Sequence, residues 1–171
     1  MAFSRLNDHV IHWDDSGQPD RPAVLFANSL GTDLRVWDAV AADLGKRWRV
    51  VRHDKRGHGL SDAPPAPYSI DDHTDDVLAL ADQIGIARFA FVGLSIGGLI
   101  GQNLALRAPE RLSALVLADT AAKIGTAESW AARIGAVETG GLASIADAVM
   151  ERWFTARFRS EQPVDLAGWR N

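Results

Sequence analysis

The stretch from Phe89 to Leu99 constrains the fold of this chain more than any other. It begins with an apolar run, continues with a serine between glycines, and ends with glycines that open a helical pattern. This order predicts a strand, a sharp turn and a helix. Ser95 lies in the turn, and Gly93 and Gly97 supply the small residues that a tight backbone needs on either side of it. A serine held in such a turn is presented as a nucleophile.

Strands and helices alternate on both sides of this stretch. Strands are predicted at residues 23–27, 49–52 and 114–118, and helices at 34–44, at 69–84 and from Ser95 to Pro109. An N-terminal hairpin is expected over residues 3–13. The alternation is typical of the α/β class, with a largely parallel sheet and flanking helices.

After Ala121 the pattern changes, and only helices are predicted. Residues 127–137 and 145–154 carry apolar stripes at helical spacing, and a glycine pair separates them. We therefore expect two parts, residues 1–121 with all the strands and residues 122–171 as a small helical excursion from the sheet.

Charge and composition exclude several classes of function. The net charge is −4 and no basic stripe occurs, so we expect neither a nucleic-acid nor a membrane partner. No cysteine is present, which excludes disulfides, thiolate metal sites and a cysteine nucleophile. No segment approaches 18 apolar residues, and a cytoplasmic location is expected.

Three motifs, read together, carry a family resemblance. They are residues 28–33 (NSLGTD), 54–62 (DKRGHGLSD) and 93–98 (GLSIGG). With them the chain resembles the α/β-hydrolase family and, within it, the 3-oxoadipate enol-lactonases, which open a small lactone in the β-ketoadipate branch of aromatic catabolism. The resemblance extends into the helical part, so that residues 1–121 would be the N-terminal part of the hydrolase core and residues 122–171 the start of a truncated helical cap.

The resemblance implies acyl transfer to a serine, with no cofactor and no metal. Ser95 would attack the carbonyl of a small lactone or ester. The tetrahedral oxyanion needs two donors, and the strand-turn-helix architecture supplies one from the backbone N–H of Ile96. The resemblance places the second at the backbone N–H of Leu30.

The expected base is missing from this sequence. The family order is serine, acid and then histidine, but all five histidines precede Ser95. We therefore interpret the sequence as an N-terminal portion of an incomplete fold, inactive alone. One alternative is a non-catalytic or split module completed by a C-terminal partner chain or by self-association through the sheet edge at residues 114–118. Another is an esterase or other small-lactone hydrolase, because related enzymes share these motifs.

Several polar residues have both a structural and a functional interpretation. His73 is expected to pack on its helix, and His9 and His12 to be solvated or to make cross-strand contacts in the hairpin. His53 and His58 are expected to flank the loop after residue 52, where His58 either orders the loop or serves as the base. Asp119 is either the acid or a surface residue. Arg56 is expected to hold the loop by pairing with Asp54 or Asp62, the alternative being that it binds substrate. Trp130 and Arg133 have two interpretations. In one, Trp130 packs in the cap and Arg133 faces solvent; in the other, the two residues contact a substrate ring and its carboxylate.

Overall fold

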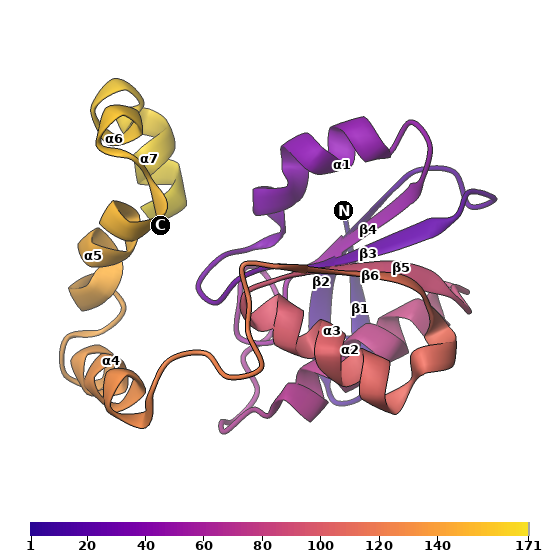
Figure 1. Cartoon of the computed structure of the whole chain (residues 1–171), viewed down its shortest axis with the longest axis horizontal. Coiled ribbons are helices and arrows are strands. Elements are labelled where there is room, and N and C mark those ends of the chain that lie inside the picture. Colours follow the sequence, from indigo (N-terminus) through magenta and orange to yellow (C-terminus); the bar gives the residue numbers. More distant parts are fainter. Residues whose placement is uncertain (171) are drawn as a thin grey trace. The chain divides into compact units, whose positions relative to one another are not determined.

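A six-stranded sheet organises the first 124 residues of the computed structural model, which describes residues 1–170 (Figure 1). The strands are β1 (Ala2–Leu6), β2 (His9–Ser16), β3 (Ala23–Ala27), β4 (Arg49–His53), β5 (Phe89–Leu94) and β6 (Leu112–Ala118). Their order in the sheet is β1-β2-β4-β3-β5-β6. The strands β4, β3, β5 and β6 are parallel, and β1 and β2 form an antiparallel hairpin whose second strand joins β4. The predicted α/β class with a largely parallel sheet is confirmed.

The central strands bury both of their faces. Along β3, Leu25 and Ala27 belong to one hydrophobic cluster, whereas Val24 and Phe26 belong to another. Successive side chains of a strand point to opposite faces, so the two clusters lie on the two sides of the sheet. This explains why the strand appears in the sequence as an unbroken apolar run.

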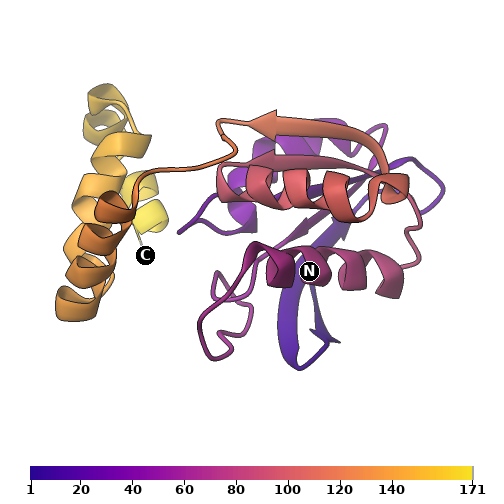
Figure 2. The ribbon, with the colours of Figure 1, turned by 60° about the horizontal axis from the view of Figure 1, so that its bottom comes forward.

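Helices cover each face of the sheet. The face that carries Val24 and Phe26 is covered by η1 (Leu34–Trp37) and α1 (Asp38–Leu44). The face that carries Leu25 and Ala27 is covered by α2 (Ile70–Gln83) and α3 (Ile96–Arg107), as Figure 2 shows from below. A short helix, η2 (Pro109–Arg111), leads into β6. Ser69 caps α2 as predicted, and its side chain and that of Asp72 form a capping box.

The carboxyl ends of the parallel strands meet at one edge of the sheet. Ala27 of β3 pairs with Gly93 of β5, and Gly93 pairs with Leu117 of β6. The loops that follow these strands therefore begin at the same level. In open parallel sheets this edge is where ligands bind.

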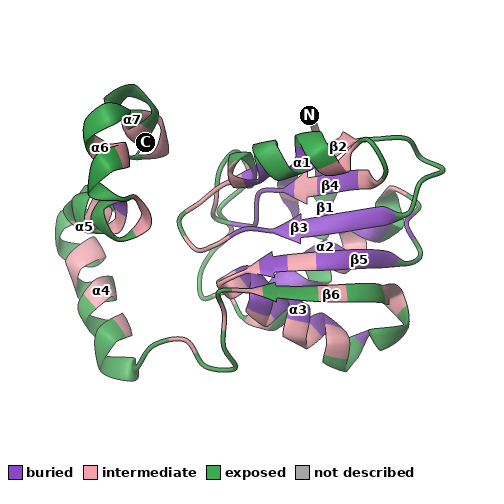
Figure 3. Cartoon of the chain, turned by 45° about the horizontal axis from the view of Figure 1, so that its top comes forward, coloured by how far each residue is buried: buried purple, intermediate pink, exposed green. Residues whose placement is uncertain are grey.

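The outer strand β6 is exposed. Most of its residues are solvent-accessible, with Val116 at 51% and Leu117 at 44% (Figure 3). Its sequence, LSALVLA, contains no charged residue and no proline. An edge of this kind can pair with another strand.

The second compact unit, Gly125–Asn171, is helical. It contains α4 (Ala127–Gly140), α5 (Ala143–Trp153), α6 (Ala156–Glu161) and α7 (Pro163–Arg170). The sequence patterns predict the first two, whereas α6 and α7 are too short to show a clear periodicity. Within residues 1–170 no helix is long and apolar enough to cross a bilayer.

Candidate active site

Ser95 joins β5 to α3 with a backbone conformation that few residues other than glycine adopt. Its φ is 56° and its ψ is −115°, a strain of roughly 1–3 kcal/mol that persists only where the surroundings hold it. They do so from the end of β6. The Ser95 N–H donates to the Ala118 carbonyl at 3.0 Å, and Thr120 Oγ1 donates to the Ser95 carbonyl at 2.7 Å. The half-buried serine is thus fixed at the carboxyl edge of the sheet.

Glycines allow the backbone to pass close to itself around this serine. A Cβ atom on Gly93 would lie 2.1 Å from the Gly97 carbonyl oxygen. A Cβ atom on Gly97 would lie 2.1 Å from the Ala27 carbonyl oxygen. Since real Cβ contacts essentially never fall below 3.0 Å, neither position accepts a side chain without a backbone shift. The first turn of α3 therefore touches the end of β3.

Several backbone N–H groups at this edge have no hydrogen-bond acceptor within residues 1–170, and two of them bear on the expected site. One belongs to Ile96, the first residue of α3, and the other to Leu30 in the loop after β3. N–H groups left unpaired at a helix N-terminus and in an adjacent loop favour negative charge nearby. They are the two groups that the resemblance assigns to the oxyanion hole.

The loop of residues 28–32, here called the oxyanion loop, is held by side chains. Asn28 is fully buried, and its Nδ2 donates to the Thr32 carbonyl. Thr32 Oγ1 donates to the Ser29 carbonyl at 2.9 Å. Lys55 Nζ donates to the carbonyls of Asn28 and Ser29 at 3.0 and 3.1 Å. Sequence analysis missed Lys55, because a lysine in a polar loop predicts an exposed side chain.

The buried carboxylate of Asp54 joins three segments around the oxyanion loop. It accepts the Leu34 N–H at 2.7 Å and the Leu60 N–H at 3.0 Å. His12 Nδ1 lies 2.7 Å from it, and both side chains are buried. His12 is therefore committed to a buried hydrogen bond with the loop that follows β4.

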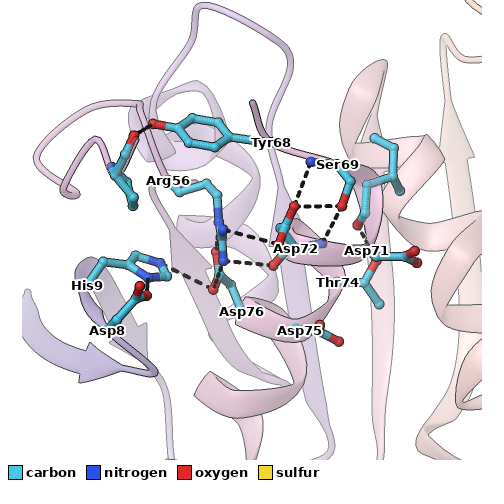
Figure 4. Close-up of polar contacts among 12 residues, drawn as sticks. Asp8, His9, Arg56, Tyr68, Ser69, Asp71, Asp72, Thr74, Asp75 and Asp76 are labelled. Carbon is cyan, nitrogen blue, oxygen red and sulfur yellow. Dashed lines mark hydrogen bonds and ion pairs between the residues drawn. The ribbon is translucent and has the colours of Figure 1, made fainter. Parts of the chain in front are cut away.

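Arg56 pairs with Asp76 of α2, and not with Asp54 or Asp62 as expected (Figure 4). Its Nε and Nη2 each donate to one Asp76 oxygen at 2.7 Å, and these bonds raise the pKa of Arg56. The expectation was wrong because Asp54 is occupied as described above and Asp62 accepts a backbone N–H of β2. Proximity along the chain indicated those partners, whereas the bidentate partner comes from a distant helix.

Replacing Arg56 with methionine should lower the free energy of unfolding by about 3–5 kcal/mol, because the Asp76 carboxylate, only 2% exposed, would lose its bidentate partner. Urea unfolding followed by circular dichroism measures this. Arg107→Met is the matched control, since Arg107 pairs with Asp75 on the surface and should contribute about 1 kcal/mol or less. Equal losses in the two variants would contradict the assignment.

No histidine is hydrogen-bonded to Ser95 in the described part of the chain. His9 and His12 are buried beside the carboxylates of Asp76 and Asp54, so the solvated role that was one of the two expected for them is wrong. His73 is buried on α2, as its position on the apolar stripe predicts. His58 lies in the loop after β4, with Nδ1 3.0 Å from the Arg56 carbonyl oxygen.

Burial keeps three of the histidines neutral. It lowers the pKa of His53 and of His58 to about 4 and that of His73 to about 3, and the nearby positive charge of Lys55 adds to the effect. A neutral imidazole can accept a proton, but a group that resists protonation so strongly is a weak base near pH 7.

Stability should fall as the pH drops from about 6.5 to about 4. The folded-state pKa values of the three histidines lie below the unfolded value of 6.5, so in this window the unfolded chain binds more protons. Each pKa unit corresponds to about 1.4 kcal/mol, so the combined loss should reach several kcal/mol. Urea unfolding at about pH 7.5 and about pH 5, where most carboxylates are still ionised, measures it. Equal stability at the two values would refute this prediction.

Asp119 directly follows β6 and is exposed. Its φ of 46° places it in the left-handed region, where aspartate is one of the more tolerated residues. Its carboxylate forms no hydrogen bond or ion pair within residues 1–170. Its part as the acid stays a prediction.

Trp130 and Arg133 lie one turn apart on α4 in the helical unit. The Arg133 guanidinium carbon is 5.6 Å from the centre of the Trp130 ring, a cation–π contact. Burial lowers the pKa of Arg133, and the charge of Arg152 lowers it further. Arg133 forms no ion pair with any residue that the structure describes. The role of both residues in binding substrate stays a prediction.

The described residues contain no cluster of three or more histidine or carboxylate side chains arranged to hold a metal ion. The arrangement at the sheet edge instead combines a strained serine with two unpaired N–H donors.

Comparison with known proteins places this arrangement in context. The family model of the alpha/beta hydrolase fold matches residues 22–136. A 3-oxoadipate enol-lactonase of Acinetobacter baylyi is 44% identical over 156 residues, which cover 91% of this chain and 58% of that protein. The crystal structure of the enol-lactonase from Burkholderia xenovorans superposes with a TM-score of 0.94 at 44% identity, covering 99% of this chain and 66% of that one.

A putative carbamate hydrolase of Caulobacter segnis is 39% identical over 112 residues, 64% of this chain and 41% of that protein. The chain thus spans little more than half the length of the curated enol-lactonases it matches. These relatives differ in the bond that their names say they hydrolyse.

Proposed function

The chain belongs to the α/β-hydrolase family, and from that premise we propose that it supplies the nucleophile and the oxyanion hole of a serine hydrolase that opens 3-oxoadipate enol-lactone. The observation that carries the proposal is the strained Ser95, which lies at the same sheet edge as the unpaired N–H groups of Leu30 and Ile96. A hydroxyl and two donors at one edge are the parts that acyl transfer requires.

In this mechanism Ser95 Oγ attacks the lactone carbonyl carbon as its proton passes to a base. The carbonyl π electrons move to the oxygen, and the N–H groups of Leu30 and Ile96 stabilise the resulting oxyanion. Collapse of this intermediate breaks the ring C–O bond, and the leaving enol oxygen takes the proton from the base. The enol stays within the same molecule, which remains attached to Ser95 as an acyl ester. Water then hydrolyses the ester. Loss of one oxyanion donor would cost about 2.7–4 kcal/mol of transition-state stabilisation.

The substrate assignment rests on the relatives and on the helical unit, which we take as the start of a cap. A lactone of this class carries a carboxylate. Arg133 is a partly buried cation whose charge is disfavoured further by Arg152, so a carboxylate bound there would relieve the repulsion. The neighbouring Trp130 would contact the ring. No step of this reaction requires a cofactor or a metal.

We infer that residues 1–171 do not supply the general base. All five histidines precede Ser95, and none is hydrogen-bonded to it in the described structure. We propose that an acid and a histidine come from polypeptide that follows residue 171 in the relatives, either in the same chain or in a partner. Sequencing the gene downstream of codon 171 tests this, since an acid and a later histidine are expected in frame or in a separate adjacent reading frame.

The alternative substrate class is a simple ester. It is favoured by the motif around Ser95, which hydrolases of several bonds share. Rates of the completed protein on the enol-lactone and on p-nitrophenyl acetate, with Ser95→Ala as the control, distinguish the two. We expect a preference for the lactone; a strong preference for the acetate would assign the protein to the esterases.

We expect residues 1–171 alone to self-associate through β6. This apolar strand lies at the edge of the sheet, and no further strand pairs with it within residues 1–170. Sedimentation velocity should show assembly that increases with protein concentration. Val116→Lys places a charge on the exposed edge and should suppress it, whereas Val164→Lys, at an exposed position in α7, should not. A monomeric wild-type chain at all concentrations would contradict this expectation.

A further inference from the structure

Lys55 is the most deeply buried basic residue that the structure describes. The residue is 1% exposed, and its ammonium group forms no ion pair with any of residues 1–170. Lysine is almost never fully buried without a partner, because removing an ammonium group from water costs several kcal/mol. The partners of Lys55 are instead two backbone carbonyls of the oxyanion loop, those of Asn28 at 3.0 Å and Ser29 at 3.1 Å.

The Ser29 carbonyl belongs to the same peptide group as the Leu30 N–H. In a trans peptide the C=O and the N–H lie in one plane and point in opposite directions. An ammonium group that holds the Ser29 oxygen therefore directs the Leu30 N–H away from Lys55. Thr32 donates to the same oxygen from Oγ1 at 2.9 Å and from its backbone N–H at 3.3 Å, so this peptide is held by both Lys55 and Thr32.

A positive charge beside the Ser29 carbonyl oxygen also changes the Leu30 N–H, the donor at the other end of the same peptide group. It draws electron density toward the oxygen and polarises the N–H bond, which strengthens the hydrogen bond that the N–H can donate. The effect is larger in a buried setting, where the effective dielectric constant is low.

We propose that Lys55 is a positioning residue for the oxyanion hole, which holds the Ser29–Leu30 peptide and directs and polarises the Leu30 N–H. The proposal rests on the function proposed above, since it assigns that N–H to the oxyanion. Lys55 acts through the peptide and has no direct part in the chemistry.

The charge on Lys55 should respond to pH near neutrality. Burial lowers its pKa to about 7, and the carboxylates of Asp54 and Asp33 oppose this only in part. The charge of Lys55 in turn lowers the pKa values of His53, His58 and His73, which are neutral near pH 7. Deprotonation leaves an amine that still donates but no longer polarises the peptide.

The test is NMR of the 171-residue chain, followed at the Leu30 amide. In the wild type, titration from about pH 6 to about pH 9 should shift the Leu30 amide proton with the same midpoint as Lys55 Nζ, near pH 7. In Lys55→Met the shift should vanish, and the order parameter of the Leu30 N–H should fall from about 0.85 to below about 0.6. Lys46→Met, which removes an exposed lysine, should behave as the wild type.

A Leu30 amide that does not titrate in the wild type would overturn the proposal, and so would an unchanged order parameter in a folded Lys55→Met. Should that variant fail to fold, the wild-type titration decides alone. Neither readout involves the reactivity of Ser95. An unreactive serine beside a titrating Leu30 amide would therefore overturn the proposed function and leave the peptide contact standing.

Discussion

Residues 1–171 alone are expected to turn over an enol-lactone about 10⁶-fold more slowly than a serine hydrolase whose histidine is in place. The members of a triad act as a unit, so removing the histidine lowers turnover almost as much as removing all three residues. What remains is roughly 10³- to 10⁴-fold over water, from the oxyanion hole and from binding. Initial rates measured beside the enol-lactonase from Burkholderia xenovorans provide the comparison.

Ser95→Ala and His58→Ala are the informative variants for this prediction. The serine variant reports the background rate, and the histidine variant tests the one histidine that lies in a loop at the carboxyl edge of the sheet. The prediction would be wrong if residues 1–171 turned over the lactone within about 100-fold of the complete enzyme and each substitution abolished that turnover. Such a result would show that residues 1–171 already contain a base.

Replacing Gly97 with alanine should destabilise the fold by about 3 kcal/mol or more, a large share of the roughly 5–15 kcal/mol that holds a domain together. The new Cβ would lie 2.1 Å from the Ala27 carbonyl oxygen. Both atoms are bound to backbone, so neither can rotate away. To relieve the clash, α3 would have to move off the end of β3, which would also displace Ser95 and the Ile96 N–H.

Two other glycine substitutions serve as controls for this effect. Gly101→Ala meets the flexible end of the Leu115 side chain at 2.9 Å and should cost less. Gly135→Ala, in α4, has open space around the new Cβ and should stabilise its helix by up to about 1 kcal/mol. Urea unfolding midpoints give the ranking. A Gly97→Ala midpoint at or above that of the wild type would contradict the close approach of α3 to β3.

The elements that carry the site could be predicted because their signals are local. Strand β3 is an unbroken apolar run, Ser69 is a capping residue at the start of a helical period, and Ser95 lies between glycines. Each pattern spans fewer than about 16 residues and depends on backbone sterics or burial that neighbouring residues determine.

The polar network could not be predicted, because its partners are distant in sequence. Arg56 is equally compatible with any nearby acid on the basis of sequence, and only the packing of α2 against the sheet brings Asp76 to it. The burial of Lys55 has the same origin: the oxyanion loop folds over it, and no periodicity marks it. In the helical unit, α6 and α7 have too few turns for a stripe to show.

Acylation of Ser95 tests the central claim most directly, that this serine is a nucleophile beside a formed oxyanion hole. Residues 1–171 would be incubated with p-nitrophenyl acetate and with imidazole, which supplies a base in solution, and the modified residue mapped by mass spectrometry of peptides. We expect an acetyl group on Ser95 that accumulates with imidazole concentration and is absent from that position in Ser95→Ala. Acetylation confined to lysines, at equal rates in the two proteins, would contradict it.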